Sequence, residues 1–114
     1  MGPVVEVRAE GNMAKMAKQI NEGMDADVRL VKLFGSTSRP RILGLLLADT
    51  GKAFYQREVM YETGLSLQAV QRELHNLVTL GILKREEIDA RVFYRIDPTS
   101  PLFKPLKEIY RLSD

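Results

Sequence analysis

The chain contains no cysteine and only one histidine, His75, among its 114 residues. The absence of cysteine excludes disulfides and thiolate metal sites, as is common for proteins of the cytoplasm. No apolar run approaches the roughly 20 residues that a membrane-spanning helix needs. The N-terminus also lacks a charged and then apolar signal segment. We therefore expect a cytoplasmic protein without a membrane span, a metal site or a bound cofactor.

Enzymatic signatures are also missing. Gly35-Ser36 resembles the start of a nucleotidyltransferase motif, but the closely spaced aspartates that would hold magnesium do not follow it. The spacing from Gly44 to Gly51-Lys52 does not fit a phosphate-binding P-loop. His75 has no serine or aspartate partner at a suggestive spacing. The sequence thus predicts a protein that is not an enzyme.

The chain has 45% apolar residues and a formal net charge of +2. That apolar content suffices for one globular core. Because the net charge is small, the placement of the basic residues is more informative than their total.

The most informative pattern lies in residues 54–96, where a short helix, a tight turn and a second helix are predicted. Gly64 supplies the positive φ that ends the first helix, and Ser66 is a good N-cap for the second. The second helix, residues 67–80, has an apolar stripe of Val70, Leu74, Leu77 and Leu80. Its opposite face carries Gln68, Gln71, Arg72, His75 and Asn76. Such side chains read base edges or hold phosphates.

A two-stranded ribbon is predicted directly after this helix. Residues 83–88 and 91–96 flank Asp89-Ala90, and Val92, Tyr94 and Ile96 alternate onto one face. Any amphipathic surface helix has polar residues outside, so the helix alone is weak support for DNA binding. The turn and ribbon around it favour a winged helix-turn-helix, a mostly α (α+β) fold with flanking N- and C-terminal helices.

The flanking segments are predicted to be helical. Ser38 is expected to cap a central buried helix with Pro40 in its first turn. A further helix should cover 28–34, and the last one should run to about Leu112 with an irregular start at Pro105. We divide the chain into a flexible arm (1–11), an N-terminal dimerisation helix (12–27), the winged helix-turn-helix (28–97) and a C-terminal helix (98–114).

An apolar stripe at helical spacing marks the N-terminal helix. It is formed by Met13, Met16, Ile20 and Met24. It could pack on its own domain, pair with a second copy or line a ligand cavity. A seam between two copies is the favoured reading, together with Leu106, Ile109 and Tyr110 of the last helix.

Several segments resemble ArsR-type winged-helix regulators. They are Leu33-Phe34-Gly35-Ser36, Arg41-Ile42-Leu43, Val70-Gln71-Arg72-Glu73-Leu74, Gly81-Ile82-Leu83 and Val92-Phe93-Tyr94-Arg95. The tail 97–103 is similar to a subgroup often encoded with small nucleotidyltransferases. The resemblance implies a dimeric bacterial or archaeal transcriptional regulator, with a small nucleotidyltransferase or another neighbouring gene product as a partner. Unlike the metal sensors of that family, this chain has no cysteine.

We therefore expect a homodimeric regulator that binds duplex DNA, with helix 67–80 in the major groove and the wing, 83–96, on the backbone. Base contacts are assigned to Gln68, Gln71 and Arg72, and phosphate contacts to Gln56 and Arg57. The further DNA-binding residues are Ser66, His75, Lys84, Arg85 and Arg91. Acidic residues in the wing, at Glu86, Glu87 and Asp89, favour the rival reading, a protein-interaction module that does not bind DNA.

Overall fold

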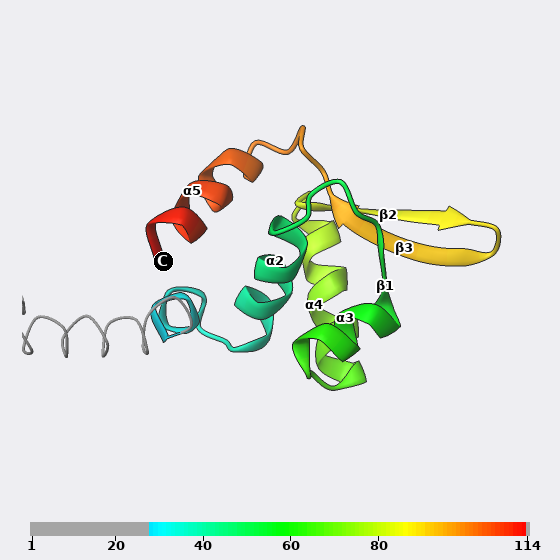
Figure 1. Cartoon of the computed structure of the whole chain (residues 1–114), viewed down its shortest axis with the longest axis horizontal. Helices are drawn as coiled ribbons and strands as arrows, with labels where there is room; N and C mark the ends of the chain where they lie inside the picture. The colour runs from blue at the N-terminus through cyan, green and yellow to red at the C-terminus, as the bar shows by residue number, and fades with distance from the viewer. Residues whose placement is uncertain (1–27, 114) are drawn as a thin grey trace, which may run out of the picture.

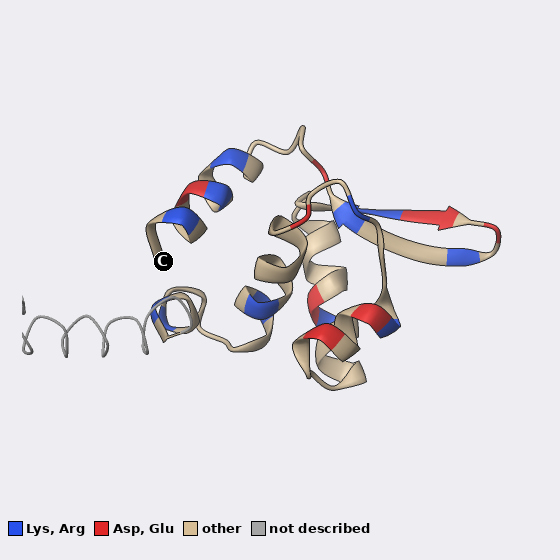
Figure 2. Ribbon diagram, in the orientation of Figure 1, with Lys and Arg blue, Asp and Glu red and all other residues tan. Residues whose placement is uncertain are grey.

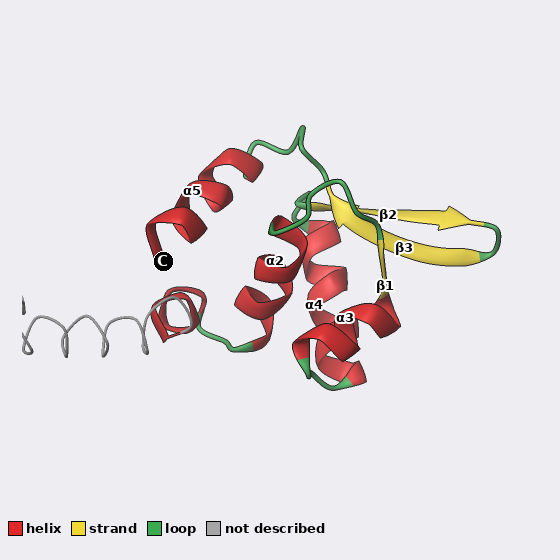
Figure 3. Ribbon diagram, in the orientation of Figure 1, coloured by secondary structure: helices red, strands yellow, loops and turns green. Residues whose placement is uncertain are grey.

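The computed structural model describes residues 28–113, so the predicted arm (1–11) and dimerisation helix (12–27) lie outside the described residues. Residues 28–34 are helical, as expected. The elements that follow are α2 (Ser38–Leu47), β1 (Phe54–Tyr55), α3 (Gln56–Thr63), α4 (Leu67–Thr79), β2 (Leu83–Ile88), β3 (Arg91–Ile96) and α5 (Phe103–Ser113) (Figure 1). Helices dominate and one small sheet accompanies them (Figure 3), which confirms the predicted mostly α (α+β) class.

Helix α2 is the centre of the hydrophobic core. Ile42, Leu43 and Leu46 are completely or almost completely buried, at 0–1% exposure. The helix contacts α3, α4 and β3, which explains why its sequence is apolar on most sides. The predicted capping role of Ser38 is wrong, because Thr37 already has helical dihedral angles and Ser38 is the first residue of the helix. Ser36 Oγ instead accepts a hydrogen bond from the Arg39 N–H at 3.3 Å.

The turn between α3 and α4 has the predicted geometry. Gly64 ends α3 with φ of 71°, a left-handed conformation that costs a glycine little. Ser66 begins α4, and its Oγ accepts a hydrogen bond from the Ala69 N–H at 3.2 Å. The Arg41 side chain donates to the carbonyl oxygen of Thr63 at 3.4 Å. This contact ties the end of α3 to α2.

Helix α4 presents its apolar stripe to α2. Val70, Leu74 and Leu77 are at most 1% exposed, as the periodicity predicted. Leu80 does not belong to the buried stripe, since it is 51% exposed. The helix ends at Thr79, and Leu80 is its C-cap. The chain turns away there through Gly81, with φ of 75°, so the helical spacing no longer determines where Leu80 points.

The three strands form an antiparallel sheet in the order β1-β3-β2. In the hairpin, Leu83 lies opposite Ile96 and Ile88 lies opposite Arg91, so the predicted strands and register are confirmed. Asp89 and Ala90 both have positive φ, at 51° and 66°. This conformation suits a two-residue hairpin loop, because its twist matches that of the strands. The hairpin projects from the helical body (Figure 1).

Helix α5 packs beside α2 and the helical residues 28–34. The Tyr110 hydroxyl donates to the Pro40 carbonyl oxygen at 2.6 Å, and its ring lies 6.5 Å from that of Phe34. A Cβ at Gly44 would approach the Tyr110 ring to 3.3 Å, so a side chain at Gly44 would crowd this contact.

Leu106, which the sequence assigned to a dimer seam, is packed inside the single chain. Leu106 is 7% exposed and belongs to the core of the single chain. Ile109 and Tyr110 are partly buried against the same core, so they too are largely used within the chain. Among the described residues, no helix is long and apolar enough to cross a membrane.

We predict that Leu74→Ala and Leu77→Ala each lower the free energy of unfolding by about 2–5 kcal/mol, because each leaves a cavity in the core. Leu80→Ala should change it by no more than about 0.5 kcal/mol, since that side chain is half exposed. Gln68→Ala is a second surface control. Chemical denaturation of the four variants measures the effect. Equal losses for Leu74→Ala and Leu80→Ala would contradict the orientation of α4.

Candidate nucleic-acid interface

The outer face of α4 carries the polar residues that the sequence assigned to DNA. Gln68, Gln71, Arg72 and His75 are all exposed, while the opposite side of the helix is buried. Asn76 is only half exposed. An α-helix with its side chains is about 10–12 Å across, close to the width of the major groove. The exposed face of α4 therefore has the size and the donor and acceptor groups for reading base edges.

The beginning of α3 is less favourable to a phosphate than the sequence suggested. Arg57 is exposed there, and Gln56 is half-buried. Glu58 Oε1 accepts a hydrogen bond from the Tyr55 N–H at 3.0 Å, and Glu58 Oε2 pairs with Lys52 Nζ at 3.1 Å. The Tyr55 hydrogen bond is the main reason that the pKa of Glu58 is lowered, and Lys52 adds to it against the opposing effect of burial. A carboxylate thus already occupies part of the positive end of this helix.

The basic residues of the wing do not share one face. From the strand register, Lys84 and Arg91 point to one side of the hairpin and Arg85 points to the other. Arg91 Nη1 donates to the Tyr55 hydroxyl at 2.8 Å, and its guanidinium lies over the Tyr55 ring. Lys84, Arg85 and Arg91 are all exposed.

One of the three wing acids is compensated within the hairpin. Glu86 forms an ion pair with Arg95 of β3 at 2.8 Å. Glu87 and Asp89 are exposed near the end of the hairpin. Figure 2 shows acidic segments toward the hairpin tip and basic ones nearer its base, with a further basic segment on β3. The same view shows basic segments on α5, so charge alone does not select one face of the molecule.

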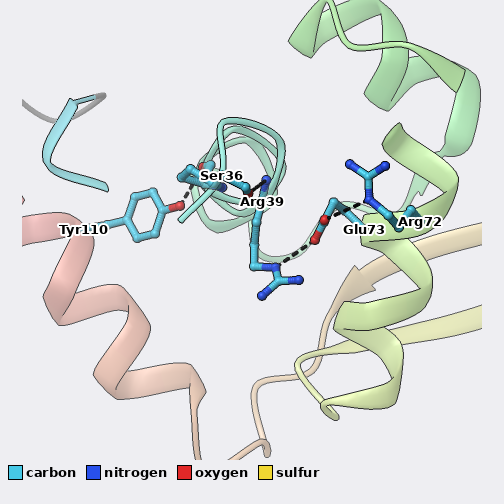
Figure 4. Close-up of polar contacts among 6 residues, drawn as sticks. Ser36, Arg39, Arg72, Glu73 and Tyr110 are labelled. Carbon is cyan, nitrogen blue, oxygen red and sulfur yellow. Dashed lines mark hydrogen bonds and ion pairs between the residues drawn. The ribbon is translucent and has the colours of Figure 1, made fainter. Parts of the chain in front are cut away.

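Helix α4 also carries a buried carboxylate that we did not predict from the sequence. Glu73 is 3% exposed and is paired with Arg39 of α2 and with Arg72. Figure 4 shows the three side chains between α2 and α4. A signal was present in the sequence, because Glu73 follows Val70 by three residues and precedes Leu77 by four. An acid in an inward stripe calls for a buried cationic partner.

A groove beside α3 was also missed. It is lined by Tyr55, Arg57, Glu58, Tyr61 and Arg91 and has a volume of about 600 Å³. Tyr61 is 85% exposed, unusually high for a large aromatic side chain on a helix. Two of the predicted DNA-binding residues, Arg57 and Arg91, therefore lie on one groove, although they are far apart in the sequence.

The described residues contain no group of three or more histidine, cysteine or acidic residues placed to hold a metal ion.

No protein-family model and no curated protein matches the chain. Among solved structures, the chain is similar to the crystal structure of a transcriptional regulator of the MarR family from Silicibacter pomeroyi. The TM-score is 0.64 and the sequence identity 20%, and the match covers 88% of this chain and 70% of that one. At this identity the likeness shows the fold alone. The chain has a winged-helix fold, as predicted, whereas the ArsR subtype receives no support from this match.

The lowered pKa of Glu58 yields a prediction about pH. A carboxyl whose pKa is lower in the folded state stabilises the protein above its unfolded pKa, and this contribution is lost as the pH falls through the folded pKa. Unfolding of the parent protein and of Glu58→Gln should therefore be compared from about pH 3 to pH 7. We expect the stability advantage of the parent to shrink as the pH falls. A difference that is independent of pH would contradict the role assigned to this carboxylate.

Proposed function

We propose that the chain is a sequence-specific, duplex DNA-binding transcriptional regulator that acts as a homodimer. In this proposal, α4 enters the major groove and the hairpin of β2 and β3 lies on the backbone. The observation that carries the proposal is the outer face of α4, where exposed Gln68, Gln71 and Arg72 stand on a helix fixed by its buried side. Glutamine can bond adenine with two hydrogen bonds, and arginine can do so with guanine.

The remaining contacts are proposed to position the protein rather than to read sequence. Arg57 of α3 and the exposed wing cations would meet phosphates, with Lys84 and Arg91 on one side of the hairpin and Arg85 on the other. The Ser66 Oγ already accepts a hydrogen bond that caps α4, so its DNA contact would be made by donating the hydroxyl hydrogen. His75 would lie at the edge of the interface, one turn beyond Arg72.

We further propose that the dimer seam lies at the end of the molecule opposite the hairpin. Leu33 and Leu112 are each 61% exposed there, and the Phe34–Tyr110 ring contact brings their two segments together. The stripe of Met13, Met16, Ile20 and Met24, outside the described residues, would add to the same seam. A location in the cytoplasm and a link to a neighbouring nucleotidyltransferase remain predictions from the sequence.

The rival function is protein binding without DNA. The observation that favours it is the groove with the exposed Tyr61, since large exposed aromatic side chains are enriched at protein interfaces. The exposed acids Glu87 and Asp89 at the hairpin would also oppose a phosphate backbone.

We predict different losses for two arginines. Arg72→Ala should lower the affinity for a preferred duplex by about 1–3 kcal/mol and relax base preference, as expected for a bidentate contact. Arg57→Ala should weaken binding to all duplexes alike. It should also reduce the slope of the logarithm of the binding constant against the logarithm of the salt concentration by about one, as expected for a phosphate contact. The preferred duplex is first selected by the parent protein from a random library. Both variants are then measured on that duplex and on a scrambled one over a salt series.

Two outcomes would overturn parts of this proposal. Unchanged affinity of Arg72→Ala for the selected duplex would remove Arg72 from the base contacts. If the parent protein binds no duplex at low salt, DNA binding is wrong and the protein-binding function replaces it.

The dimer is tested by placing charge in its proposed seam. Leu33→Glu with Leu112→Glu should give a monomer, or a much weaker dimer, by light scattering, because charged side chains would be buried between the copies. Leu80→Glu is the matched control, since Leu80 is also an exposed leucine but lies at the end of α4. Removal of residues 1–26 tests the methionine stripe in the same assay. If the Leu33→Glu, Leu112→Glu protein and the protein without residues 1–26 both dimerise as the parent does, the proposed seam is wrong.

A further inference from the structure

Glu73 is the only acidic side chain in the buried part of the described chain. Its side chain is 4% exposed, on the helix that is proposed to enter DNA. A buried carboxylate is costly unless cations and hydrogen bonds compensate it. An apolar residue at this position would extend the stripe of Val70, Leu74 and Leu77 without that cost. The geometry around Glu73 therefore calls for an explanation beyond packing.

The two oxygens of Glu73 are divided between two arginines. Oε1 accepts a hydrogen bond from Arg39 Nε at 2.7 Å, and Oε2 accepts one from Arg72 Nε at 3.4 Å. The Arg39 side chain is 31% exposed and the Arg72 side chain is 58% exposed. Arg72 thus reaches the solvent while its Nε is held at the buried end. In Figure 4 the two terminal nitrogens of Arg72 point away from Glu73.

Arg39, the partner of Glu73 on α2, is itself well anchored. It lies in the first turn of α2, where its N–H donates to Ser36 Oγ at 3.3 Å. The next residue, Pro40, is buried, and its carbonyl oxygen accepts the hydrogen bond from Tyr110 of α5 at 2.6 Å. Figure 4 shows Tyr110 approaching α2 from the side away from α4, while the Arg39 side chain extends toward Glu73. The carboxylate is therefore held from a fixed part of the body, and it can in turn restrain Arg72.

We propose that Glu73 is a positioning residue for sequence reading. It holds Arg72 through Nε, so that Nη1 and Nη2 are presented together toward a base edge. This inference rests on the proposed DNA-binding function and assigns a residue to it that makes no contact with DNA. Arginine is rich in rotamers, and restraining it before binding avoids part of the entropy that would otherwise be lost in the complex.

Three roles of Glu73 predict different binding results. If Glu73 acted only as a negative charge near DNA, its removal would strengthen binding to every duplex. If it were only structural, its removal would lower the melting temperature and weaken binding to every duplex. As a positioning residue, it favours the preferred duplex over a scrambled one, so its removal lowers the ratio of the two affinities. The ratio of the two affinities is therefore the decisive quantity.

The experiment uses the full chain and the duplex that the parent selects from a random library, with a scrambled duplex of equal length and composition. Glu73→Gln should lower the ratio of selected to scrambled affinity by about 3- to 10-fold, from the cost of immobilising one flexible side chain. Binding to the scrambled duplex should be unchanged or tighter. The matched control is Glu62→Gln, an exposed acid of α3, which should leave the ratio unchanged.

A double substitution tests whether Glu73 acts through Arg72. Glu73→Gln should lower the ratio in the parent but add nothing in the Arg72→Ala background. An unchanged ratio for folded Glu73→Gln, or an equal loss in both backgrounds, overturns the positioning role while leaving DNA binding intact. If the parent enriches no sequence from the library, the proposed function fails, and this inference fails with it.

A measurement on the unaltered protein covers the case in which Glu73→Gln does not fold. The side-chain Nε–H of each arginine can be followed by nitrogen-15 NMR in the absence of DNA. We expect the Arg72 Nε–H to be ordered and protected from exchange, like that of Arg39. The Nε–H of exposed Arg57 should be mobile and should exchange with water. An Arg72 signal as mobile as that of Arg57 overturns the proposal.

Discussion

The packing of α4 against α2 is the constraint on which the rest of the structure depends. Val70, Leu74 and Leu77 are buried against a helix whose own Ile42 and Leu43 are fully enclosed. This burial fixes the rotation of α4 about its axis. The residues on the opposite side of α4, such as Gln68, Gln71 and Arg72, must then face outward. An apolar contact inside the domain thus decides which polar groups can meet a ligand outside it.

Ion pairs adjust the charge of the surfaces that this packing exposes. Glu58, Glu73 and Glu86 would each oppose a nucleic acid, but each has a cationic partner in Lys52, Arg39 or Arg95. The pairs of Glu58 and Glu86 are partly exposed, so they contribute little to stability. Their effect is local, because each lowers the negative potential that a phosphate would encounter. Among the wing acids, only Glu87 and Asp89 remain exposed.

The hairpin and α5 lie at different ends of the described chain (Figure 1). Polar side chains suited to DNA are found on α4 and the hairpin, whereas the exposed Leu33 and Leu112 lie on the helices at the other end. This separation would let a second copy and a duplex bind without competing for one surface. The hydrogen bond from Tyr110 to the first turn of α2 connects the two regions through the body of the domain.

The sequence alone was sufficient for the elements between residues 28 and 113, including the hairpin register and the turn at Gly64 and Ser66. Those features depend on helical or strand periodicity and on capping groups within a few residues, which are local properties. It was insufficient for the pairing of Glu73 with Arg39, which are 34 residues apart. Nor could it show that Arg91 donates to the Tyr55 hydroxyl, 36 residues away, or that Leu106 is used inside the domain. Leu80 lay outside the buried stripe because the helix had already ended there. These outcomes depend on which distant surfaces meet, and only the tertiary structure decides that.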